Sequence, residues 1–442
     1  RTSDIDLLHG RKCASALYSI ELVGTTQLIH TFGPTLLPFP LYTFQYFPGI
    51  RLAADLNTGS IRSGFMDGNR ISRRTLLGRA AIVPATAVYA SAANSAVTVG
   101  LIGTGNRGPF VAQLMAQHTA ARVVALCDVV PEKMARAANS IGAGGARHYT
   151  DLQQLLASDV DAVIIATPVY LHAEHFEAAV KAGKHIYIEK PAEVDVEGCK
   201  RIMRTADSAD RKLHITFGFQ RRSGELYQKA KRAVDSGVIG ALRLGSARFI
   251  KSSGSWGAAG QRMPRPVTEA EKAAAWGSWR HLSGDLIVEN NVHLIDVLNW
   301  FLGGRPRSAI GSGSTLLNRR GDVRDHNFVA FEYANGIQGQ LSGTTLAPPG
   351  YRDVTEQFFG ERGVVETSEN HWRHFRAAGQ ETYEKAPRNI SIDAVTEFVK
   401  HVTEGTPQNN AVRGAESTLT AILGRMAMDA RREVTWDEMM RG

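Results

Sequence analysis

The sequence predicts an α/β protein with two domains, a doubly wound parallel sheet followed by an α/β domain with a large, mainly antiparallel open sheet. Two patterns predict this class. Between residues 96 and 217, buried strands alternate with helices of about ten residues, which is typical of a parallel sheet. Beyond residue 217, strand-like runs follow one another with few helices between them. The 442 residues, 43% hydrophobic and 21% charged, suit a soluble globular chain and exclude a fibrous or wholly disordered one.

The first 92 residues are expected to lie outside the two domains. Residues 1–65 have no sustained period and are interrupted by prolines, so we interpret them as a non-native or disordered extension before a true start at Met66. In residues 66–92, Arg73 and Arg74 precede a short apolar run that ends in small residues near Ala90, the pattern of a twin-arginine signal peptide. This run is too short for a transmembrane anchor. The alternative is a chance arginine pair before a buried helix.

Charge and cysteine content exclude several kinds of partner and site. The formal net charge is +8, but residues 1–92 hold 9 basic and 5 acidic residues, so the rest carries only (51−9)−(43−5) = +4, too mild to indicate nucleic acid or a membrane surface as a partner. The three cysteines form neither a disulfide framework nor a metal-ligand cluster, so no metal site is expected. Because twin-arginine export carries folded proteins, a periplasmic or otherwise exported location is compatible with a chain without disulfides and favours a bound cofactor.

The elements of the first domain, residues 96–217, follow from its hydrophobic runs. Strands are expected at 96–102, 122–127, 162–166, 185–188 and 213–217. Helices are expected at 109–118, around Glu132, from Asp151, at 172–182 and at 196–209.

The second domain, residues 218–442, is dominated by strands. These are expected at 242–250, 308–315, 327–333, 337–344 and 355–359, and Asn335-Gly336 is typical of a hairpin turn. Helices are expected at 223–236, 286–301, 391–403 and 415–430. The segment 251–281 has many Gly, Ser and Trp residues and little periodicity, which indicates a functional loop or a disordered segment.

A glycine-rich turn between the first strand and the first helix indicates dinucleotide binding. Gly103 permits the tight turn, Gly105 lets the backbone approach a pyrophosphate, and Gly108 lets helix and strand pack closely. Asp128 ends the next strand, where its carboxylate would accept hydrogen bonds from ribose hydroxyls and repel a 2′-phosphate, so NAD is favoured over NADP. The alternative is a glycine-rich turn with an Asp helix cap. The cofactor-binding residues expected in the turn are Gly103, Thr104, Gly105, Asn106, Arg107 and Gly108.

Polar residues follow two later strands of the first domain. Because the carboxyl ends of parallel strands border the ligand crevice, Thr167, Pro168, Glu189 and Lys190 are expected at the nicotinamide end of the cofactor, with His172 nearby. Lys190 can hold a substrate hydroxyl there and favour its deprotonation. Taken alone, a lysine before a proline is typical of a solvated turn, and His172 is typical of a helix start.

The helix expected at 286–301 carries a candidate base. Glu289 and His293 are four residues apart and so share one face, and Asp296 follows three residues later. A carboxylate beside an imidazole raises the pKa of the ring and orients it, which suits a general base near neutral pH. The alternative is a Glu–His pair on a helix surface.

Aromatic and polar residues elsewhere could contact a substrate. Trp256, Trp276 and Trp279 can stack on a sugar ring, although core filling explains each of them equally well. Gln220 follows the last strand of the first domain and is expected near the same crevice.

Together these motifs resemble the Gfo/Idh/MocA oxidoreductases, named after glucose-fructose oxidoreductase and inositol dehydrogenase. The resemblance covers about residues 96–430 and rests on the glycine turn, Asp128, Thr167-Pro168, Glu189-Lys190-Pro191 and the segment from Gly284 to Asp296. It implies a Rossmann dinucleotide-binding domain followed by an open-sheet α/β domain that acts on secondary alcohols of sugars and cyclitols. It also implies a homo-oligomer, a dimer or a tetramer.

The resemblance assigns roles within the site as well. The family's catalytic lysine falls on Lys190 and its catalytic histidine on His293. The usual aspartate four residues before that histidine is Glu289 here, and Asn291 stands where the family commonly has glycine. The expected catalytic residues are Lys190, His293 and Glu289, and the expected substrate-binding residues are Lys190, Gln220, Trp279, Asn290 and His293.

The expected function is NAD-dependent oxidation of a sugar, sugar derivative or cyclitol at a secondary hydroxyl, with a cofactor that could stay tightly bound. His293 would remove the hydroxyl proton, Lys190 would position the oxygen, and Glu289 would hold His293. Two alternatives stay open. One is an NAD-dependent glycosidase or lyase that acts by transient oxidation and elimination, and the other is a non-catalytic module that binds NAD or sugar.

Overall fold

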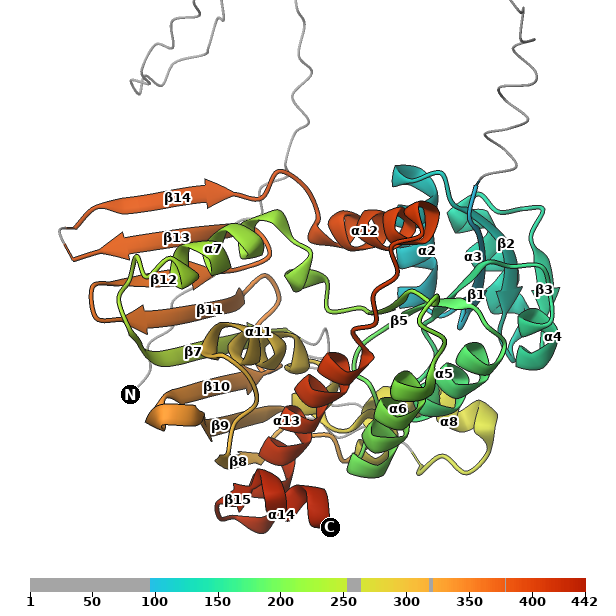
Figure 1. The fold of residues 1–442 in the computed structure, drawn as a ribbon. Coiled ribbons are helices and arrows are strands. Elements are labelled where there is room, and N and C mark those ends of the chain that lie inside the picture. Colours follow the sequence, from blue (N-terminus) through green and yellow to red (C-terminus); the bar gives the residue numbers. More distant parts are fainter. Residues whose placement is uncertain (1–95, 253–263, 318–320, 378) are drawn as a thin grey trace, which may run out of the picture. The chain divides into compact units, whose positions relative to one another are not determined.

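The computed structural model describes residues 96–252, 264–317, 321–377 and 379–442, and the fold is drawn in Figure 1. All of these residues belong to one compact unit, Ala81–Gly442. The predictions made for residues 1–92, including the twin-arginine signal, lie outside the described residues, as does Trp256.

The first domain is built on six parallel strands. They are hydrogen-bonded in the order β3-β2-β1-β4-β5-β6, the arrangement of a doubly wound dinucleotide-binding sheet. All five strands that the sequence predicts are present, and β3 is an additional short strand with mostly exposed residues. The strands are β1 (Thr98–Ile102), β2 (Arg122–Cys127), β3 (Arg147–Tyr149), β4 (Ala162–Ile165), β5 (His185–Ile188) and β6 (Ile215–Phe217).

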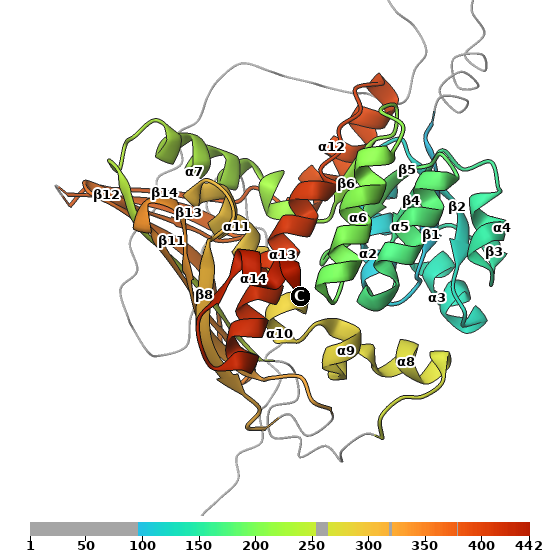
Figure 2. The same cartoon turned by 60° about the horizontal axis from the view of Figure 1, so that its bottom comes forward.

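Helices cover both faces of this sheet, because successive strand side chains point to opposite sides. Leu101 packs in one hydrophobic cluster with residues of α2 (Arg107–His118) and α3 (Pro131–Ile141), whereas Ile102 packs in another with residues of α5 (His172–Lys181) and α6 (Val196–Ser208). The short helix α4 (Leu152–Leu156) begins after Asp151, as predicted, and the Asp151 side chain caps it. Figures 1 and 2 show this layered arrangement.

The second domain is a nine-stranded sheet with the order β14-β13-β12-β11-β7-β10-β9-β8-β15. Only β7 and β10 pair in parallel, and the other neighbouring strands are antiparallel. The predicted fold class is therefore confirmed. The strands are β7 (Leu242–Lys251), β8 (Ser308–Ser314), β9 (His326–Glu332), β10 (Gln338–Thr344), β11 (Arg352–Gly360), β12 (Gly363–Thr367), β13 (His371–Arg376), β14 (Glu381–Lys385) and β15 (Val434–Thr435).

Three helices, α7 (Glu225–Asp235), α11 (Val292–Leu302) and α13 (Ala411–Ala430), pack on one face of the large sheet (Figure 1). On the other face, Ile310 and Phe328 are 54% and 57% exposed. The chain then returns to the first domain, where α12 (Ile390–Glu404) packs on α2 and α13 packs on α6. Helix α14 (Trp436–Arg441) ends the chain. None of the helices in the described ranges is long and apolar enough to cross a membrane.

The structure corrects two predictions for the second domain. The helix expected at 286–301 is broken into α10 (Leu286–Glu289) and α11 at Asn290 and Asn291. The segment 251–281 is not an irregular loop from residue 269 on, because it forms α8 (Glu269–Ala275), the 3₁₀ turn η3 (Trp276–Ser278) and α9 (Arg280–Ser283) there. A capping box at Thr268 and Glu271 begins α8, and such a short helix leaves too few residues to show a period.

Candidate functional site

The glycine turn connects β1 to α2, and its glycines are in different surroundings. Gly103 has φ +91°, and a Cβ there would lie 2.6 Å from backbone atoms of Ala166. A Cβ on Gly108 would lie 2.1 Å from the carbonyl oxygen of Gly103. By contrast, a Cβ on Gly105 would meet no atom within 4 Å. The first and third glycines are thus required by packing within the protein, whereas the second leaves open space in front of the backbone.

Asp128 fixes the same turn from the end of β2. Its Oδ2 accepts hydrogen bonds from the backbone N–H and the hydroxyl of Thr104, at 2.8 and 3.0 Å, and its Oδ1 accepts one from the N–H of Val130 at 3.0 Å. The carboxylate remains partly accessible. It can therefore accept further hydrogen bonds from a ribose while its negative charge opposes a 2′-phosphate.

Arg107 connects the glycine turn to the end of β5. Its Nε donates to Oε1 of Glu189 at 2.8 Å, and the Glu189 side chain is only 4% exposed. The Arg107 Nη2, the Glu189 Oε2 and the Tyr187 hydroxyl are buried and have no hydrogen-bond partner among the residues that the structure describes. Unpartnered buried polar atoms cost free energy, so this group favours an additional polar ligand beside the turn.

His172 holds together the loops that follow β4 and β5. Its Nδ1 lies 2.7 Å from the carbonyl oxygen of Pro191, and its Nε2 lies 3.0 Å from that of Thr167. Burial lowers the pKa of the His172 imidazole. The Thr167 hydroxyl in turn lies 3.1 Å from Nδ1 of His175. The buried His172 therefore connects the loops at the carboxyl ends of β4 and β5, with both ring nitrogens engaged by backbone carbonyls.

Lys190 reaches from the end of β5 to the end of α10. Its Nζ donates to the backbone carbonyl of Glu289 at 2.6 Å and lies 3.3 Å from Oε1 of the Glu289 carboxylate. The Lys190 side chain is 12% exposed and that of Glu289 is 26% exposed. Two residues that are 99 positions apart in the sequence are thus brought together at the crevice, as expected for a shared site.

His293 lies at the start of α11, and the structure corrects what the sequence predicts about its partner. Glu289 contacts Lys190 instead of the imidazole, because the break after α10 separates the two residues that one helix would have paired. The buried Nδ1 of His293 has no hydrogen-bond partner within the described ranges. Burial, and next the positive charge of Lys190, lower the pKa of His293 well below its ordinary value. The ring is therefore neutral at pH 7, and the expected rise in pKa is wrong.

Asp296 and Asn291 have structural partners. Asp296 accepts a bidentate pair of hydrogen bonds from Arg222, from Nε to Oδ2 at 2.8 Å and from Nη2 to Oδ1 at 2.9 Å, and another from the Ser417 hydroxyl at 2.7 Å. Asn291 is fully buried, and its Oδ1 accepts a hydrogen bond from Asn327 Nδ2 at 2.9 Å. These contacts fix α11 against its neighbours and so fix His293.

The remaining residues expected to contact the substrate lie in different surroundings. Asn290 is partly exposed beside Glu289 at the break between the helices. Gln220 is buried, and its Oε1 has no hydrogen-bond partner in the described part of the chain. Trp279 is 5% exposed and packs with Ala275 and Leu282, which is the core-filling alternative that the sequence left open.

Lys251 is a charged neighbour of the site that the sequence analysis missed. It ends β7, and its pKa is lowered by burial and then by Arg352, while Glu289 raises it and Lys190 lowers it. The charges of Glu289 and Lys190 thus both act on Lys251, with opposite effects on its pKa. A lysine directly after the strand predicted at 242–250 was the available signal in the sequence.

The site fits a dinucleotide and contains no metal centre in the described ranges. The open space at Gly105, the acceptor at Asp128 and the unpartnered polar atoms at Arg107 and Glu189 suit a pyrophosphate and a ribose. Among the residues that the structure describes, no group of three or more His, Cys, Asp or Glu side chains could hold a metal ion.

Comparison with known sequences is consistent with this geometry. Residues 97–217 match the profile of the oxidoreductase family with an NAD-binding Rossmann fold, and residues 227–366 match the GFO/IDH/MocA C-terminal domain. Inositol 2-dehydrogenase 3 of Saccharopolyspora erythraea is 31% identical over 272 residues, which are 61% of this chain and 72% of that protein. Myo-inositol 2-dehydrogenase of Thermotoga maritima is 24% identical over 361 residues, which are 77% of this chain and 99% of that protein.

Solved structures share the fold. Levoglucosan dehydrogenase in complex with NADH and levoglucosan has a TM-score of 0.66 at 20% identity, covering 77% of this chain and 99% of that one. Myo-inositol 2-dehydrogenase from Lactobacillus plantarum has a TM-score of 0.62 at 21% identity, covering 77% and 99%. The two-domain fold, the dinucleotide turn and the 31% identical relative lead to one conclusion: this chain belongs to the GFO/IDH/MocA family and is an NAD-dependent oxidoreductase of the inositol dehydrogenase type, acting on CH–OH groups.

Proposed function

We propose that Lys190 and His293 are the catalytic residues of a dehydrogenase that oxidises one secondary hydroxyl of a cyclitol or sugar. The observation that carries this proposal is the contact of Lys190 with Glu289 at the crevice, beside an imidazole whose pKa the same lysine lowers. The cationic Lys190 and the neutral base His293 are therefore neighbours at the carboxyl ends of the first sheet, on the side of the second domain.

Each of these residues has a distinct task. The Lys190 ammonium donates to the substrate oxygen and stabilises the negative charge that develops on it. His293 is neutral at pH 7 and accepts the hydroxyl proton at its Nε2, the nitrogen opposite the buried Nδ1. Glu289 is a positioning residue, because its carbonyl and carboxylate oxygens direct Nζ of Lys190. When bound, NAD⁺ supplies the acceptor for the hydride.

The cofactor would be held by the chain's own turn and strand ends. Gly103, Gly105 and Gly108 shape the turn, Asp128 contacts the adenosine ribose, and Thr167 borders the nicotinamide. The substrate class is supported by relatives that are named inositol 2-dehydrogenases and by a structural neighbour named levoglucosan dehydrogenase.

Variants of the two proposed catalytic residues should lose turnover but keep their affinity for the cofactor. We expect Lys190→Ala and His293→Ala to lower turnover of myo-inositol or levoglucosan by ~10²-fold or more, the loss typical of a positioned acid or base. NADH affinity should stay near that of the unaltered protein, because neither side chain contacts the pyrophosphate. Exposed residues of the same types provide matched controls, Lys181→Ala and His118→Ala, which should keep full turnover. Full turnover in His293→Ala would remove it as the base.

Product analysis separates the dehydrogenase from a glycosidase or lyase. Stoichiometric NADH formation with a ketone product supports oxidation. Cleavage of a glycoside without net NADH formation, or NADH binding without turnover of any polyol, would contradict the proposed reaction.

We also propose export by the twin-arginine route and assembly into a homo-oligomer. Export is supported by Arg73 and Arg74 before an apolar run. Assembly is supported by the apolar side chains Ile310 and Phe328, exposed on a sheet face that no described helix covers. Replacing both arginines with lysine should retain the protein in the cytoplasm, and light scattering should give a mass of two or four chains. Undiminished export or a monomer would contradict the respective proposal.

A further inference from the structure

The loop after β5 carries Lys190, and its backbone is held by side chains. Residues 190–194 lie between β5 and α6 and make no backbone–backbone hydrogen bond within the described part of the chain. The carbonyl oxygen of Pro191 lies 2.7 Å from Nδ1 of His172. Because proline has no N–H, Ala192 is the first residue after Lys190 whose N–H can fix the loop. The position of Lys190 therefore depends on what binds Ala192 and the residues after it.

Two side chains of α13 bind this loop. The N–H of Ala192 donates to the hydroxyl of Thr418 at 2.9 Å. Two turns further along the helix, Nη1 of Arg425 donates to the carbonyl of Val194 at 2.8 Å and to that of Gly284, just before α10, at 3.0 Å. Residues seven positions apart lie on the same face of a helix, so α13 presents both side chains to the loop together.

Thr418 is oriented and shielded for this contact. Its hydroxyl donates to the carbonyl of Gly414, one turn earlier, at 3.0 Å, so its oxygen is left to accept the hydrogen bond from Ala192. The Thr418 side chain is fully buried. If the hydroxyl were lost, the N–H of Ala192 would have to move or stay unpartnered, because water does not reach it there.

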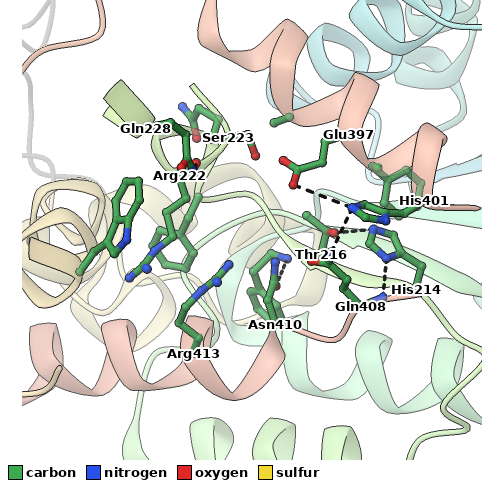
Figure 3. A pocket seen from close by; sticks show the side chains of 16 residues that line it. His214, Thr216, Arg222, Ser223, Gln228, Glu397, His401, Gln408, Asn410 and Arg413 are labelled. Atoms are coloured by element: carbon green, nitrogen blue, oxygen red, sulfur yellow. Dashed lines mark hydrogen bonds and ion pairs between the residues drawn. The ribbon is translucent and has the colours of Figure 1, made fainter. Parts of the chain in front are cut away.

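The start of α13 is fixed to the edge of the first sheet. The N–H of Phe217, at the end of β6, donates to Oδ1 of Asn410 at 2.8 Å, and the N–H of Gln408 donates to Nδ1 of His214 at 3.0 Å. Figure 3 shows His214, Gln408 and Asn410 in the wall of a pocket of about 240 Å³ beside this end of the helix. The helix is thus tied to the sheet whose strand ends carry Lys190.

The same helix also holds the element that carries His293. The hydroxyl of Ser417, the residue before Thr418, donates to Oδ1 of Asp296 on α11 at 2.7 Å. Adjacent residues of α13 therefore contact the Lys190 loop on one side and the helix of His293 on the other. This arrangement makes α13 a common support for the two proposed catalytic groups.

We propose that Thr418 is a positioning residue for Lys190, which it holds at a fixed place relative to His293 by binding the N–H of Ala192. This inference rests on the proposed catalytic role of Lys190. The hydrogen bond from Lys190 to the substrate oxygen strengthens as negative charge develops in the transition state. A displaced loop therefore lowers kcat more than it raises KM.

Two threonine variants of the same helix form a matched pair for the test. Thr420 is also fully buried, and its hydroxyl accepts a hydrogen bond from Asn299 and donates one to Glu416, both at 2.9 Å. With myo-inositol or levoglucosan, Thr418→Val should lower kcat by roughly tenfold or more while KM stays within about threefold. Thr418→Ser keeps the oxygen and should restore kcat. Thr420→Val loses an equivalent buried hydrogen bond away from the loop and should keep kcat.

An NMR titration of His293 tests the position of Lys190 without relying on turnover. After burial, the charge of Lys190 is the largest cause that lowers the pKa of His293. Thr418→Val should therefore raise the pKa of His293 and move the acid limb of the kcat/KM profile to higher pH. Thr420→Val should leave both as they are in the unaltered protein.

These measurements separate failure of the positioning role from failure of the proposed reaction. The inference is overturned if Thr418→Val keeps both the kcat and the His293 pKa of the unaltered protein. It is also overturned if Thr420→Val loses as much kcat, because a weakened α13 would then explain both variants. Full turnover in Lys190→Ala would instead refute the proposed reaction, while a raised His293 pKa in Thr418→Val would still support the positioning of Lys190. If Thr418→Val does not fold, Thr418→Ala removes the hydroxyl without adding a methyl group and should give the same results.

Discussion

Gly108→Ala is expected to destabilise the protein without any ligand present. The added Cβ would lie 2.1 Å from the carbonyl oxygen of Gly103, whereas real Cβ atoms essentially never approach another atom closer than 3.0 Å. The helix or the turn must therefore move by about 1 Å, since no side-chain rotation can relieve an overlap with backbone. Overpacking of this kind costs ~1–3 kcal/mol, of which the better helix propensity of alanine recovers up to about 1 kcal/mol. We expect the melting temperature to fall by several degrees.

Gly105→Ala is the matched comparison for Gly108→Ala, because it adds the same methyl group to the same turn. A Cβ there meets nothing within 4 Å, and Gly105 does not have a positive φ, so the free energy of unfolding should change by less than ~0.5 kcal/mol. The methyl group would instead occupy the open space in front of the turn. If that space is where the pyrophosphate lies, NADH binding should weaken by tenfold or more, equivalent to ~1.4 kcal/mol.

Two measurements on each variant separate these effects. Thermal melting without cofactor should be lowered for Gly108→Ala only, and titration with NADH, followed by nicotinamide fluorescence, should be weakened for Gly105→Ala. A Gly108→Ala protein that melts like the unaltered one would refute the close approach of α2 to the turn. Normal NADH affinity in Gly105→Ala would refute the placement of the pyrophosphate.

Other substitutions test the remaining parts of the site and the core. Asp128→Ser should bring the affinities for NADPH and NADH closer together, and equal affinities in the unaltered protein would contradict the assignment. Lys190→Met should raise the pKa of His293 in an NMR titration, because it removes the charge that, after burial, lowers this pKa most; an unchanged pKa would mean that the two groups are uncoupled. In the unaltered enzyme the lowered pKa keeps His293 neutral down to a lower pH than an ordinary histidine. Turnover should therefore begin to fall only at a pH below the ordinary pKa of histidine. Arg221→Met should lower the free energy of unfolding, measured in urea, by ~3–5 kcal/mol, because it removes the cation that pairs with the fully buried Glu356 at 2.5 Å; a loss below ~1 kcal/mol would contradict this.

The first domain was predictable because its signals are local. Buried parallel strands are continuous apolar runs, as in β4, and two helix starts carry Asp151 and Asp195, whose side chains cap the helices by accepting backbone hydrogen bonds. Gly103 and Asp128 are also recognised by their position relative to β1 and β2. These signals can be recognised from the sequence because each depends on residues close to it along the chain.

The strands missed in the second domain lack such a signal. In β14 the alternation is between partly and fully exposed residues, and β13 contains charged side chains such as Arg373 and Arg376. In β13 only Trp372 and His374 are buried, so its alternation is too short to stand out, and both strands depend on pairing with each other and with β12. Their register depends on partners and hairpins, which periodicity does not reveal.

The break between α10 and α11 shows why the catalytic geometry needs the tertiary structure. Apolar residues continue through 286–301, so the pattern favours one helix with Glu289 beside His293. Asn291 ends that continuity, because its buried amide binds Asn327 on β9, and Gly343 on β10 leaves room for it: a Cβ there would lie 2.3 Å from Oδ1 of Asn291. Because of the break, Glu289 contacts Lys190. In the proposed mechanism the carboxylate therefore positions the lysine, and the imidazole of His293 acts as a neutral base without a carboxylate of its own.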